Sequence, residues 1–320
     1  MGTSTDPTFD SLRGGRVFVA GARTALGGAI ARALRGLDGV DVCGLDTPEA
    51  ALRDPSAAED TFARLTPTHV IVAGGRSGGI ALNRQAPADL MLDNLRLASA
   101  ILPAAHRQHV RSLLFVASSC TYPRSAAQPM RPDALLSGPL EPTSEAYAMA
   151  KLAGIVLCQA YRDQYGAHFV PAIAADSYGP GDTFDPDNSH VVAGLIRRMH
   201  EARVRGDATF SVWGTGCQVR DLVYVDDLAT ACLIALACYD DRVPINLSAG
   251  APTSIADLAV AVREVVGFNG DLVFDTTKPD GASIKTLDTA PIRLLGFTPR
   301  TALRDGLQRT YRWFLEHPAP

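Results

Sequence analysis

Short apolar runs alternate with amphipathic segments along the N-terminal half of the chain. Residues 16–21 (RVFVAG) form a β-branched run that ends in glycine, and apolar residues then recur at helical spacing through 25–36 (ALGGAIARALRG). The same alternation predicts further strands at 39–46, 68–75, 112–119 and 168–176, with helices near 88–108 and 143–165. Nearly continuous apolar strands separated by helices indicate a parallel sheet with both faces covered. We therefore predict an α/β fold with a Rossmann-like, doubly wound parallel sheet.

The pattern loosens from about Ser177 onward. Loops rich in glycine, proline and aspartate occupy 179–188 and 275–283, which is typical of a smaller, irregular portion that binds substrate. Residues 221–236 (DLVYVDDLATACLIAL) predict a return of the chain to the first unit, so the boundary is not a single cut. We expect a smaller C-terminal α/β domain beside the sheet.

Composition and charge restrict the classes of partner. The chain has 320 residues, 47% of them hydrophobic, and 30 basic against 34 acidic residues give a net charge of -4. That balance does not favour nucleic acid or an anionic membrane, so we expect a small-molecule partner. Residues 1–15 lack the apolar core of a signal peptide and no long apolar run occurs, which predicts a cytoplasmic protein. The six cysteines show no metal-ligand spacing, so we expect buried, reduced thiols and no metal.

The turn after the first strand is a candidate dinucleotide site. Residues 21–27 (GARTALG) join strand to helix, where glycines let backbone N–H groups approach a pyrophosphate at the helix N-terminus. Asp46, at the end of the second predicted strand, is placed to bind an adenosine ribose hydroxyl. An ordinary strand-to-helix turn and a helix-cap aspartate are the alternatives. The candidate cofactor-binding residues are Gly21, Arg23, Thr24, Ala25, Leu26, Gly27, Asp46, Ala73 and Gly74.

A helix carries Tyr147 and Lys151 one turn apart, in the segment YAMAK. At that spacing the ammonium group can lower the pKa of the phenol and orient a nicotinamide ribose. A phenol so perturbed can donate a proton to a carbonyl that receives hydride. The alternative, a solvated helix face, is weakened by Ser118, which ends an upstream strand and can serve as a second donor.

The chain resembles the extended short-chain dehydrogenase/reductases and, among them, the GDP-L-fucose synthase family. The resemblance runs from the first strand to TYRWFLE and is most specific in SSCTYP, SGPLEPTSEAYAMAKLAG, YGPGDTFDPDNSHVVAGLIRRMHEA, WGTGCQVRDLVYVDDLA and FDTTKPDG. It implies that Ser118, Tyr147 and Lys151 form a reductase triad. It also implies that Cys120 and His190 are an epimerase acid/base pair. The implied substrate-binding residues are Ser119, Asp176, Asn188, Arg198, Trp213, Arg220 and Lys278.

The chemistry implied by the resemblance suits these side chains. A ketone at carbon 4 of a hexose acidifies the hydrogens on carbons 3 and 5, because the carbanion delocalises into an enolate that Tyr147 and Ser118 can stabilise. Inversion needs two groups of moderate pKa on opposite faces, and a thiol (about 8.5) with an imidazole (about 6.5) meets that need. A small buried hydrophobic role for Cys120 and a loop or cap role for His190 are the alternatives.

The sequence departs from the family pattern at four positions. Thr24 replaces the middle glycine of the fingerprint, and Asp46 stands where the family tends to have a basic residue for the 2′-phosphate of NADP. Asp176 replaces an expected asparagine, and Ile284 an expected arginine. NAD(P)H is therefore the expected cofactor, with NADH slightly favoured by Asp46 and NADPH by the resemblance, and the nucleotide or the sugar can differ from GDP and mannose.

These inferences combine into an expected organisation and function. We expect a flexible tail at 1–13, a dinucleotide-binding domain at 14–176 with about 221–240, and a nucleotide-sugar-binding domain at 177–220 and 241–320. The expected function is epimerisation and reduction of a nucleotide-linked 4-keto-6-deoxy-hexose by a homodimer. An epimerase-only or ketoreductase-only enzyme and, less well supported, a non-catalytic dinucleotide sensor are the alternatives.

Overall fold

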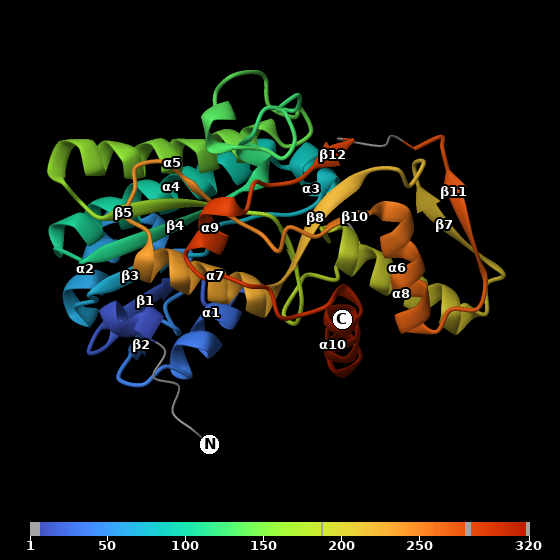
Figure 1. Cartoon of the computed structure of the whole chain (residues 1–320), viewed down its shortest axis with the longest axis horizontal. Helices are drawn as coiled ribbons and strands as arrows, with labels where there is room; N and C mark the ends of the chain where they lie inside the picture. The colour runs from blue at the N-terminus through green and yellow to red at the C-terminus, as the bar shows by residue number, and fades with distance from the viewer. Residues whose placement is uncertain (1–6, 187, 279–282, 318–320) are drawn as a thin grey trace.

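The computed structural model of the chain describes residues 7–186, 188–278 and 283–317. These residues form a larger lobe around a parallel sheet and a smaller lobe beside it (Figure 1). Each lobe encloses its own cluster of buried apolar side chains. In the described ranges, no helix is long and apolar enough to cross a membrane.

The larger lobe is built on six parallel strands in the order β2-β1-β3-β4-β5-β9. Their bounds are Arg16–Ala20 (β1), Asp41–Cys43 (β2), His69–Val72 (β3), Ser112–Ser118 (β4), Phe169–Ala174 (β5) and Ile245–Leu247 (β9). The chain passes from β1 to β2 on one side and then to β3 on the other, so the order reverses between β1 and β3. A reversal of this kind opens a crevice at the carboxyl ends of the strands, where ligands bind. The predicted doubly wound fold is confirmed.

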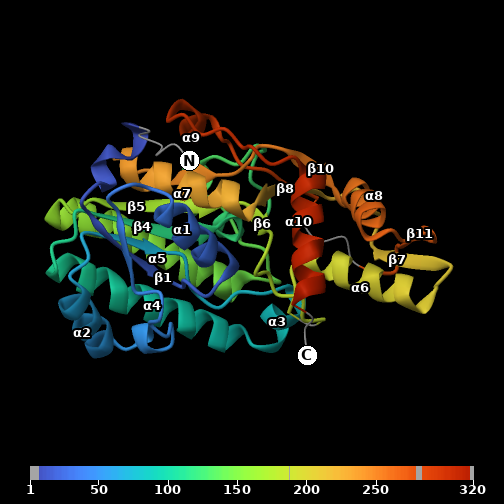
Figure 2. The ribbon, with the colours of Figure 1, turned by 90° about the horizontal axis from the view of Figure 1, so that it is seen from below.

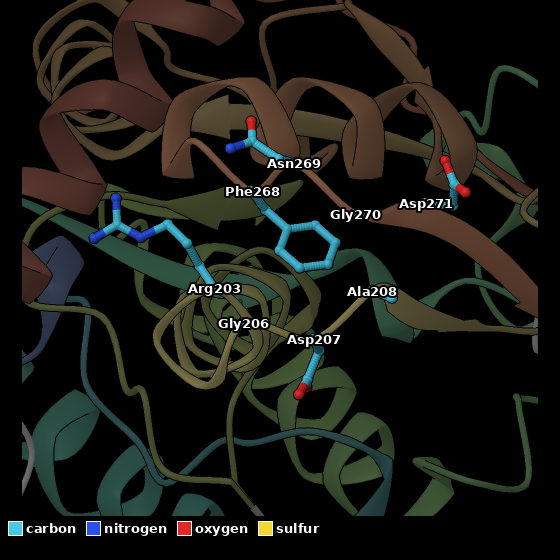
Figure 3. A pocket seen from close by; sticks show the side chains of 8 residues that line it. All are labelled: Arg203, Gly206, Asp207, Ala208, Phe268, Asn269, Gly270 and Asp271. Atoms are coloured by element: carbon cyan, nitrogen blue, oxygen red, sulfur yellow. The ribbon is translucent and has the colours of Figure 1, made fainter.

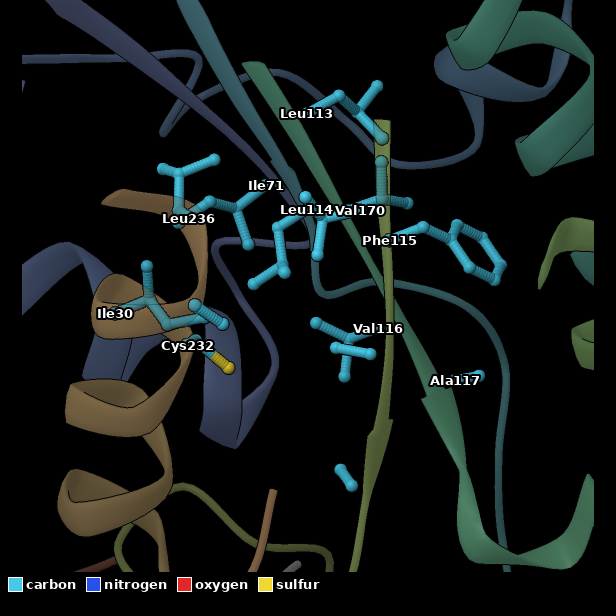
Figure 4. Close-up of a cluster of buried hydrophobic side chains, with 14 of the residues drawn as sticks. Ile30, Ile71, Leu113, Leu114, Phe115, Val116, Ala117, Val170, Cys232 and Leu236 are labelled. Carbon is cyan, nitrogen blue, oxygen red and sulfur yellow. The ribbon is translucent and has the colours of Figure 1, made fainter. Parts of the chain in front are cut away.

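Helices cover both faces of this sheet (Figure 2). One face carries α1 (Ala25–Arg35) and α7 (Val225–Cys238), and the other carries α2 (Pro55–Leu65), α4 (Pro87–Arg107) and α5 (Glu145–Tyr165). Figure 4 shows Ile30 of α1 and Cys232 and Leu236 of α7 facing the sheet residues Ile71 and Leu114. All five side chains are almost fully buried. Successive residues of β3, and nearly all of those of β4, are buried as well, so these strands are covered on both faces as the sequence pattern requires.

The smaller lobe is organised around strand β8 (Val219–Tyr224). β8 pairs with β6 (Asp176–Tyr178), β10 (Pro252–Ser254) and β12 (Ile284–Lys285), while β7 (Thr209–Trp213) pairs with β11 (Asp271–Asp275). Three helices complete the lobe: α6 (Val191–Arg205), α8 (Ile255–Val266) and α10 (Leu303–Glu316). In the β8 ladders, Arg220 lies opposite Lys285 and Leu222 lies opposite Asp176. β8 therefore brings Asp176 and Lys285 together although the sequence separates them widely.

Two details differ from the expected organisation. Residues Pro7–Leu12 form a 3-10 helix in which Leu12 is fully buried, so the expected flexible tail is wrong there; residues 1–6 lie outside the described residues. β9 joins the large sheet, because α7 provides the crossover for a sixth parallel strand, and Ile292 and Phe297 also pack into that lobe. The expectation that all of 241–320 belongs to the smaller domain is therefore wrong for these residues. α3 (Ile80–Gln85) and α9 (Ala290–Leu294) are short connecting helices.

Candidate active site

A glycine cradle lies where β1 and β3 end. Gly21 has φ +86°, and a Cβ on it would lie 2.4 Å from the Gly74 Cα. A Cβ on Gly27 would lie 2.0 Å from the Gly21 carbonyl oxygen, so the first turn of α1 sits directly against the end of β1. Only glycine permits these approaches. The cradle and the adjoining helix N-terminus fit the pyrophosphate of a dinucleotide, and Ala73 joins β3 to Gly74.

Thr24 remodels the turn instead of disrupting it. Thr24 is the N-cap of α1: its Oγ1 accepts a hydrogen bond from the Gly27 N–H at 3.0 Å and donates one to the Gly21 carbonyl at 2.8 Å. A threonine side chain therefore closes the turn that a glycine would leave open. Arg23 beside it is exposed, and Ala25 and Leu26, in the first turn of α1, are half-buried. A Cβ on Gly181 would lie 3.3 Å from the Ala25 Cα, so the loop after β6 reaches this helix N-terminus.

The acidic side chain that reaches the cradle is Glu49. The prediction that Asp46 ends the second strand is wrong, because β2 ends at Cys43 and Gly44, with φ +79°, turns the chain against the Phe18 ring. Asp46 lies beyond it in an exposed turn. The Glu49 carboxylate instead accepts a hydrogen bond from the Gly75 N–H at 3.1 Å. Sequence reasoning missed Glu49, since no motif marks the loop after β2.

Lys151 connects the glycine cradle to strand β4. Its ammonium donates hydrogen bonds to the carbonyls of Gly74 (3.0 Å) and Val116 (3.2 Å), and the residue is only 5% exposed. Burial lowers the pKa of Lys151 to about 8, against the opposing effect of the Glu49 carboxylate. Asn94 of α4, also buried, donates to the Arg76 carbonyl and holds the segment that follows β3. The predicted position of Lys151 beside the cofactor cradle fits this geometry.

Tyr147 lies beside Ser118 at the carboxyl end of β4. The two hydroxyl groups form a hydrogen bond, which favours the ionised phenol, but burial outweighs it, and Cys120 and Asp176 also raise the pKa of Tyr147. The pKa of Tyr147 is therefore raised, and the prediction that Lys151 lowers it is wrong. The Lys151 ammonium is directed to two backbone carbonyls instead. A phenol that stays protonated is suited to donate a proton to a carbonyl oxygen.

Cys120 makes a polar contact that a purely hydrophobic residue would not make. It lies half-buried directly after β4, and its Sγ accepts a hydrogen bond from the Lys285 ammonium at 3.3 Å. Lys285 in turn lies 3.6 Å from the Asp176 carboxylate. Sequence reasoning missed Lys285. A signal was present, because the chain has only three lysines, and the other two are the candidates Lys151 and Lys278.

The remaining cysteines divide into two groups. None of the six cysteines, all of which lie in the described ranges, takes part in a disulfide; Cys158 and Cys232 are buried, as the composition predicts, and Cys43 is half-buried. Cys217 and Cys238 are exposed, so the expectation of buried thiols is wrong for those two. Cys238 ends α7, and its thiol donates to the Thr8 carbonyl at 3.3 Å.

His190 enters the same region from the smaller lobe. It is the N-cap residue of α6, its side chain is exposed, and it lies near enough to Asp176 and Asp182 to favour both carboxylates. The loop before it docks on the larger lobe, because the Asn188 carbonyl accepts a hydrogen bond from the Gly79 N–H at 3.2 Å. Asp176 is thus a shared neighbour of His190 and of the Lys285 that contacts Cys120.

Cationic and aromatic side chains line the smaller lobe. The Arg198 guanidinium lies 5.2 Å from the centre of the Trp213 ring, and the Lys278 ammonium lies 5.9 Å from the same ring. Trp213 is 60% exposed, so a flat ligand has access to it. Arg220 lies close enough to Asp176 to stabilise its carboxylate. Ser119 is buried behind β4, and within the described ranges its hydroxyl has no hydrogen-bond partner.

A separate surface hollow of about 410 Å³ lies at the end of α6 (Figure 3). It is lined by Arg203, Gly206, Asp207, Ala208, Phe268, Asn269, Gly270 and Asp271. None of these residues belongs to the candidate set. The glycines of the cradle, Lys151, Tyr147 and Cys120 lie instead around the carboxyl ends of β1, β3 and β4. Arg198, Trp213 and Lys278 form a separate group on the smaller lobe, and Asp46 lies in an exposed turn.

This fold and site define an extended short-chain dehydrogenase/reductase. A family profile described as the NAD dependent epimerase/dehydratase family matches residues 17–249. The chain belongs to that family and, within it, to the GDP-L-fucose synthase family.

Individual relatives resemble the chain along nearly its whole length. A probable GDP-L-fucose synthase 1 of Oryza sativa subsp. japonica is 44% identical, over 99% of this chain and 98% of the relative. A GDP-L-fucose synthase of Sinorhizobium fredii is 43% identical, over 96% of this chain and 98% of the relative. The crystal structure of a GDP-L-fucose synthetase from Naegleria fowleri bound to NADP superposes with a TM-score of 0.87 at 26% identity, covering 95% of each chain.

Proposed function

We propose that the protein is an epimerase/reductase of a GDP-linked 4-keto-6-deoxy-hexose. The observation that carries this proposal is that the hydroxyl groups expected to serve reduction and the thiol expected to serve epimerisation lie together at the end of β4. Ser118 and Tyr147 are placed to bind one carbonyl oxygen, and Cys120 follows Ser118 by two residues. The enolate formed in epimerisation and the alkoxide formed in reduction carry charge on that same oxygen. One set of donors therefore serves both half-reactions.

Epimerisation uses Cys120 and His190 in this proposal. One of the pair removes a proton from carbon 3 or carbon 5, and the other returns a proton to the opposite face of that carbon. Ser118 and Tyr147 donate hydrogen bonds to the enolate oxygen while the carbon is deprotonated. Trp213, Arg198 and Lys278 are placed to hold the nucleotide diphosphate, because cations beside an exposed aromatic ring favour an anionic, planar ligand.

Reduction completes the sequence. When bound in the cradle of Gly21, Gly27 and Gly74, NAD(P)H supplies the hydride that reduces carbon 4. Tyr147 delivers its phenolic proton to the oxygen of carbon 4. Lys151, fixed between the carbonyls of Gly74 and Val116, lies beside the cradle, where its ammonium is placed to orient the nicotinamide ribose. The Tyr147 phenolate that remains recovers its proton from solvent.

For the cofactor, the proposal slightly favours NADH over NADPH. Asp46, which is exposed, and Glu49, which reaches the cradle, both place negative charge on the loop after β2. Like charges a few ångströms apart near a protein surface cost on the order of 1 kcal/mol or more. Arg23 opposes this, because it can turn to neutralise a 2′-phosphate. The test compares kcat/KM for NADH and NADPH in the native protein and in Asp46→Arg. A native preference for NADPH that the substitution leaves unchanged would contradict the role of Asp46.

The function itself is tested with purified protein, GDP-4-keto-6-deoxy-D-mannose and each reduced cofactor. We expect a product that NMR shows to be inverted at carbons 3 and 5 and reduced at carbon 4. Cys120→Ser should yield chiefly an unepimerised, reduced sugar, because the hydroxyl is a far weaker base than the thiolate. Reduced sugar without inversion in the native protein would identify a ketoreductase only, and inversion without oxidation of cofactor an epimerase only. Binding of NADPH with no conversion would favour the non-catalytic sensor.

We further propose a cytoplasmic homodimer. Free thiols fit a reducing compartment. Leu92 of α4 and Met149 and Val156 of α5 are each more than 40% exposed, and Met149 and Val156 lie two helical turns apart on one face. Pairing of these helices with those of a second copy would bury that apolar face. Light scattering should give twice the chain mass, and Val156→Glu should give a monomer; a native monomer would overturn the proposal.

A further inference from the structure

Cys120, Lys285 and Asp176 form a chain of polar contacts that the expected acid/base pair does not account for. The Lys285 ammonium lies 3.3 Å from the Cys120 Sγ and 3.6 Å from Asp176 Oδ1. The Lys285 side chain is 18% exposed and that of Asp176 35% exposed. Lys285 belongs to β12 and Asp176 to β6, and both strands are fixed against β8. The backbone positions of both residues are therefore set by strand pairing, and the side-chain contacts fix the Lys285 ammonium between Cys120 and Asp176.

The charged groups around Lys285 have opposing effects on its pKa. Burial alone would lower the pKa of Lys285, but Asp176 and Cys120 raise it above its ordinary value, while Arg220 acts in the opposite sense. Burial raises the pKa of Asp176, and Lys285, Arg220 and His190 outweigh that effect and lower it. Tyr147 and Asp221 also lie near enough to sense Asp176. Both partners of the Lys285–Asp176 pair are thus charged at neutral pH.

We propose that Lys285 is a positioning residue for epimerisation that holds Cys120 as a thiolate, and that Asp176 anchors the Lys285 ammonium and moderates its effect on Cys120. This inference rests on the proposed function, and it adds a source for the base that the function needs. An ammonium beside a thiol stabilises the thiolate, which is the form able to remove a proton.

The proton balance of the step is complete without a proton from Lys285. The Cys120 thiolate takes a proton from the carbon beside the ketone, so a C–H bond breaks and an S–H bond forms. The electron pair moves into the enolate, whose oxygen Tyr147 and Ser118 hold. The His190 imidazolium then protonates the opposite face of that carbon, and the carbonyl is restored. The Cys120 thiol and the neutral His190 return to their starting forms by exchanging a proton with solvent.

Asp176 makes the proposal specific to this chain. The family resemblance leads us to expect asparagine at this position, and the carboxylate found instead reduces the positive field that Lys285 exerts on Cys120. Removal of either charge should therefore change the ease of thiolate formation at Cys120 in a predictable direction. Lys285→Met should make the thiolate harder to form, whereas Asp176→Asn should make it easier to form. If the pair had a purely structural role, the two substitutions would not have opposite effects on thiolate formation.

The test measures the pH dependence of alkylation of Cys120 by iodoacetamide, with the modified peptides resolved by mass spectrometry. The midpoint should rise by about 1 to 2 pH units in Lys285→Met and fall by up to about 1 unit in Asp176→Asn. Cys238, which is exposed at the end of α7, provides a reference thiol in the same sample, and its midpoint should not move. An unchanged midpoint in Lys285→Met, or shifts of the same sign in the two variants, would overturn the proposal.

A conservative variant protects the test against misfolding. Lys285→Arg keeps the charge, so the Cys120 midpoint should return to within about half a unit of the native value. Failure of Lys285→Arg to restore the midpoint, while circular dichroism matches the native protein, would also overturn the proposal. The alkylation assay needs no sugar substrate. A protein that failed to convert the nucleotide-sugar would refute the proposed function and still report on Lys285.

A second readout connects the pair to the reaction. In deuterated water, epimerisation incorporates deuterium at carbons 3 and 5. Lys285→Met should slow this incorporation by about 10- to 100-fold near neutral pH, in line with the expected shift of the midpoint, with part of the loss recovered at higher pH as more thiolate forms. A loss that stays constant across the pH range would assign Lys285 to substrate binding instead and would contradict the proposal.

Discussion

Substitution of Lys151 by methionine should change how stability depends on pH. Lys151 is buried, its pKa is lowered from 10.5 to about 8, and methionine has a similar length without charge. Between these two pH values the unfolded chain holds a proton that the native chain has released. Stability therefore rises with pH across this window for the native sequence, and the Lys151→Met variant lacks that increase.

The magnitude follows from the difference in pKa. A lowering of about 2.5 units, at about 1.4 kcal/mol for each unit, corresponds to about 3.5 kcal/mol in the free energy of unfolding across the full window. The native protein should gain about 2 to 3 kcal/mol relative to Lys151→Met between about pH 7 and about pH 10. Groups shared by the two proteins cancel in this difference. The sign is that of a buried amine, whose charged form is the less stable one in the folded chain.

Urea unfolding without added cofactor, at several pH values across this range, measures the difference. Lys278→Met is the matched control, because Lys278 is exposed and should show a difference that does not vary with pH. The reasoning would be refuted if the free energies of unfolding of the native protein and of Lys151→Met differed by the same amount from about pH 7 to about pH 10. It would mean that the Gly74 and Val116 carbonyls fully compensate the burial of the ammonium group.

Three further predictions concern the cradle and the triad. Tyr147→Phe should slow hydride transfer by about 100-fold or more with little change in cofactor affinity, which stopped-flow absorbance of the reduced nicotinamide measures; near-native oxidation would remove Tyr147 from the role of proton donor. Gly21→Ala should abolish cofactor binding in a fluorescence titration, because its Cβ would meet Gly74 at 2.4 Å and its φ is +86°; native affinity would contradict the cradle. Thr24→Ala should lower the free energy of unfolding by about 1 kcal/mol through loss of the cap, whereas unchanged stability would show that solvent replaces the Oγ1 contacts.

The sequence by itself determined the fold class and the local relation between Tyr147 and Lys151. Continuous apolar strands between amphipathic helices can be buried only in a parallel sheet covered on both faces, and that pattern needs no knowledge of contacts. Tyr147 and Lys151 lie one turn apart on a single helix, so local geometry fixes their relation. The glycines of the turn at 21–27 are likewise local, and their close approach follows from the strand-to-helix connection.

Only the tertiary structure decided which charged groups reach these local motifs. The apolar pattern extends to Asp46, yet Gly44 ends the strand early against Phe18, and the loop then carries Glu49 to the cradle. Burial of Tyr147 and Lys151 changed the pKa relation that their helical spacing suggests, because desolvation depends on every element around them. Lys285 reaches Cys120 through the pairing of β12 with β8, a contact between residues 165 positions apart. Strand pairing over such distances leaves no periodic trace in the sequence, and for this reason the partner of the thiol was visible only in the folded chain.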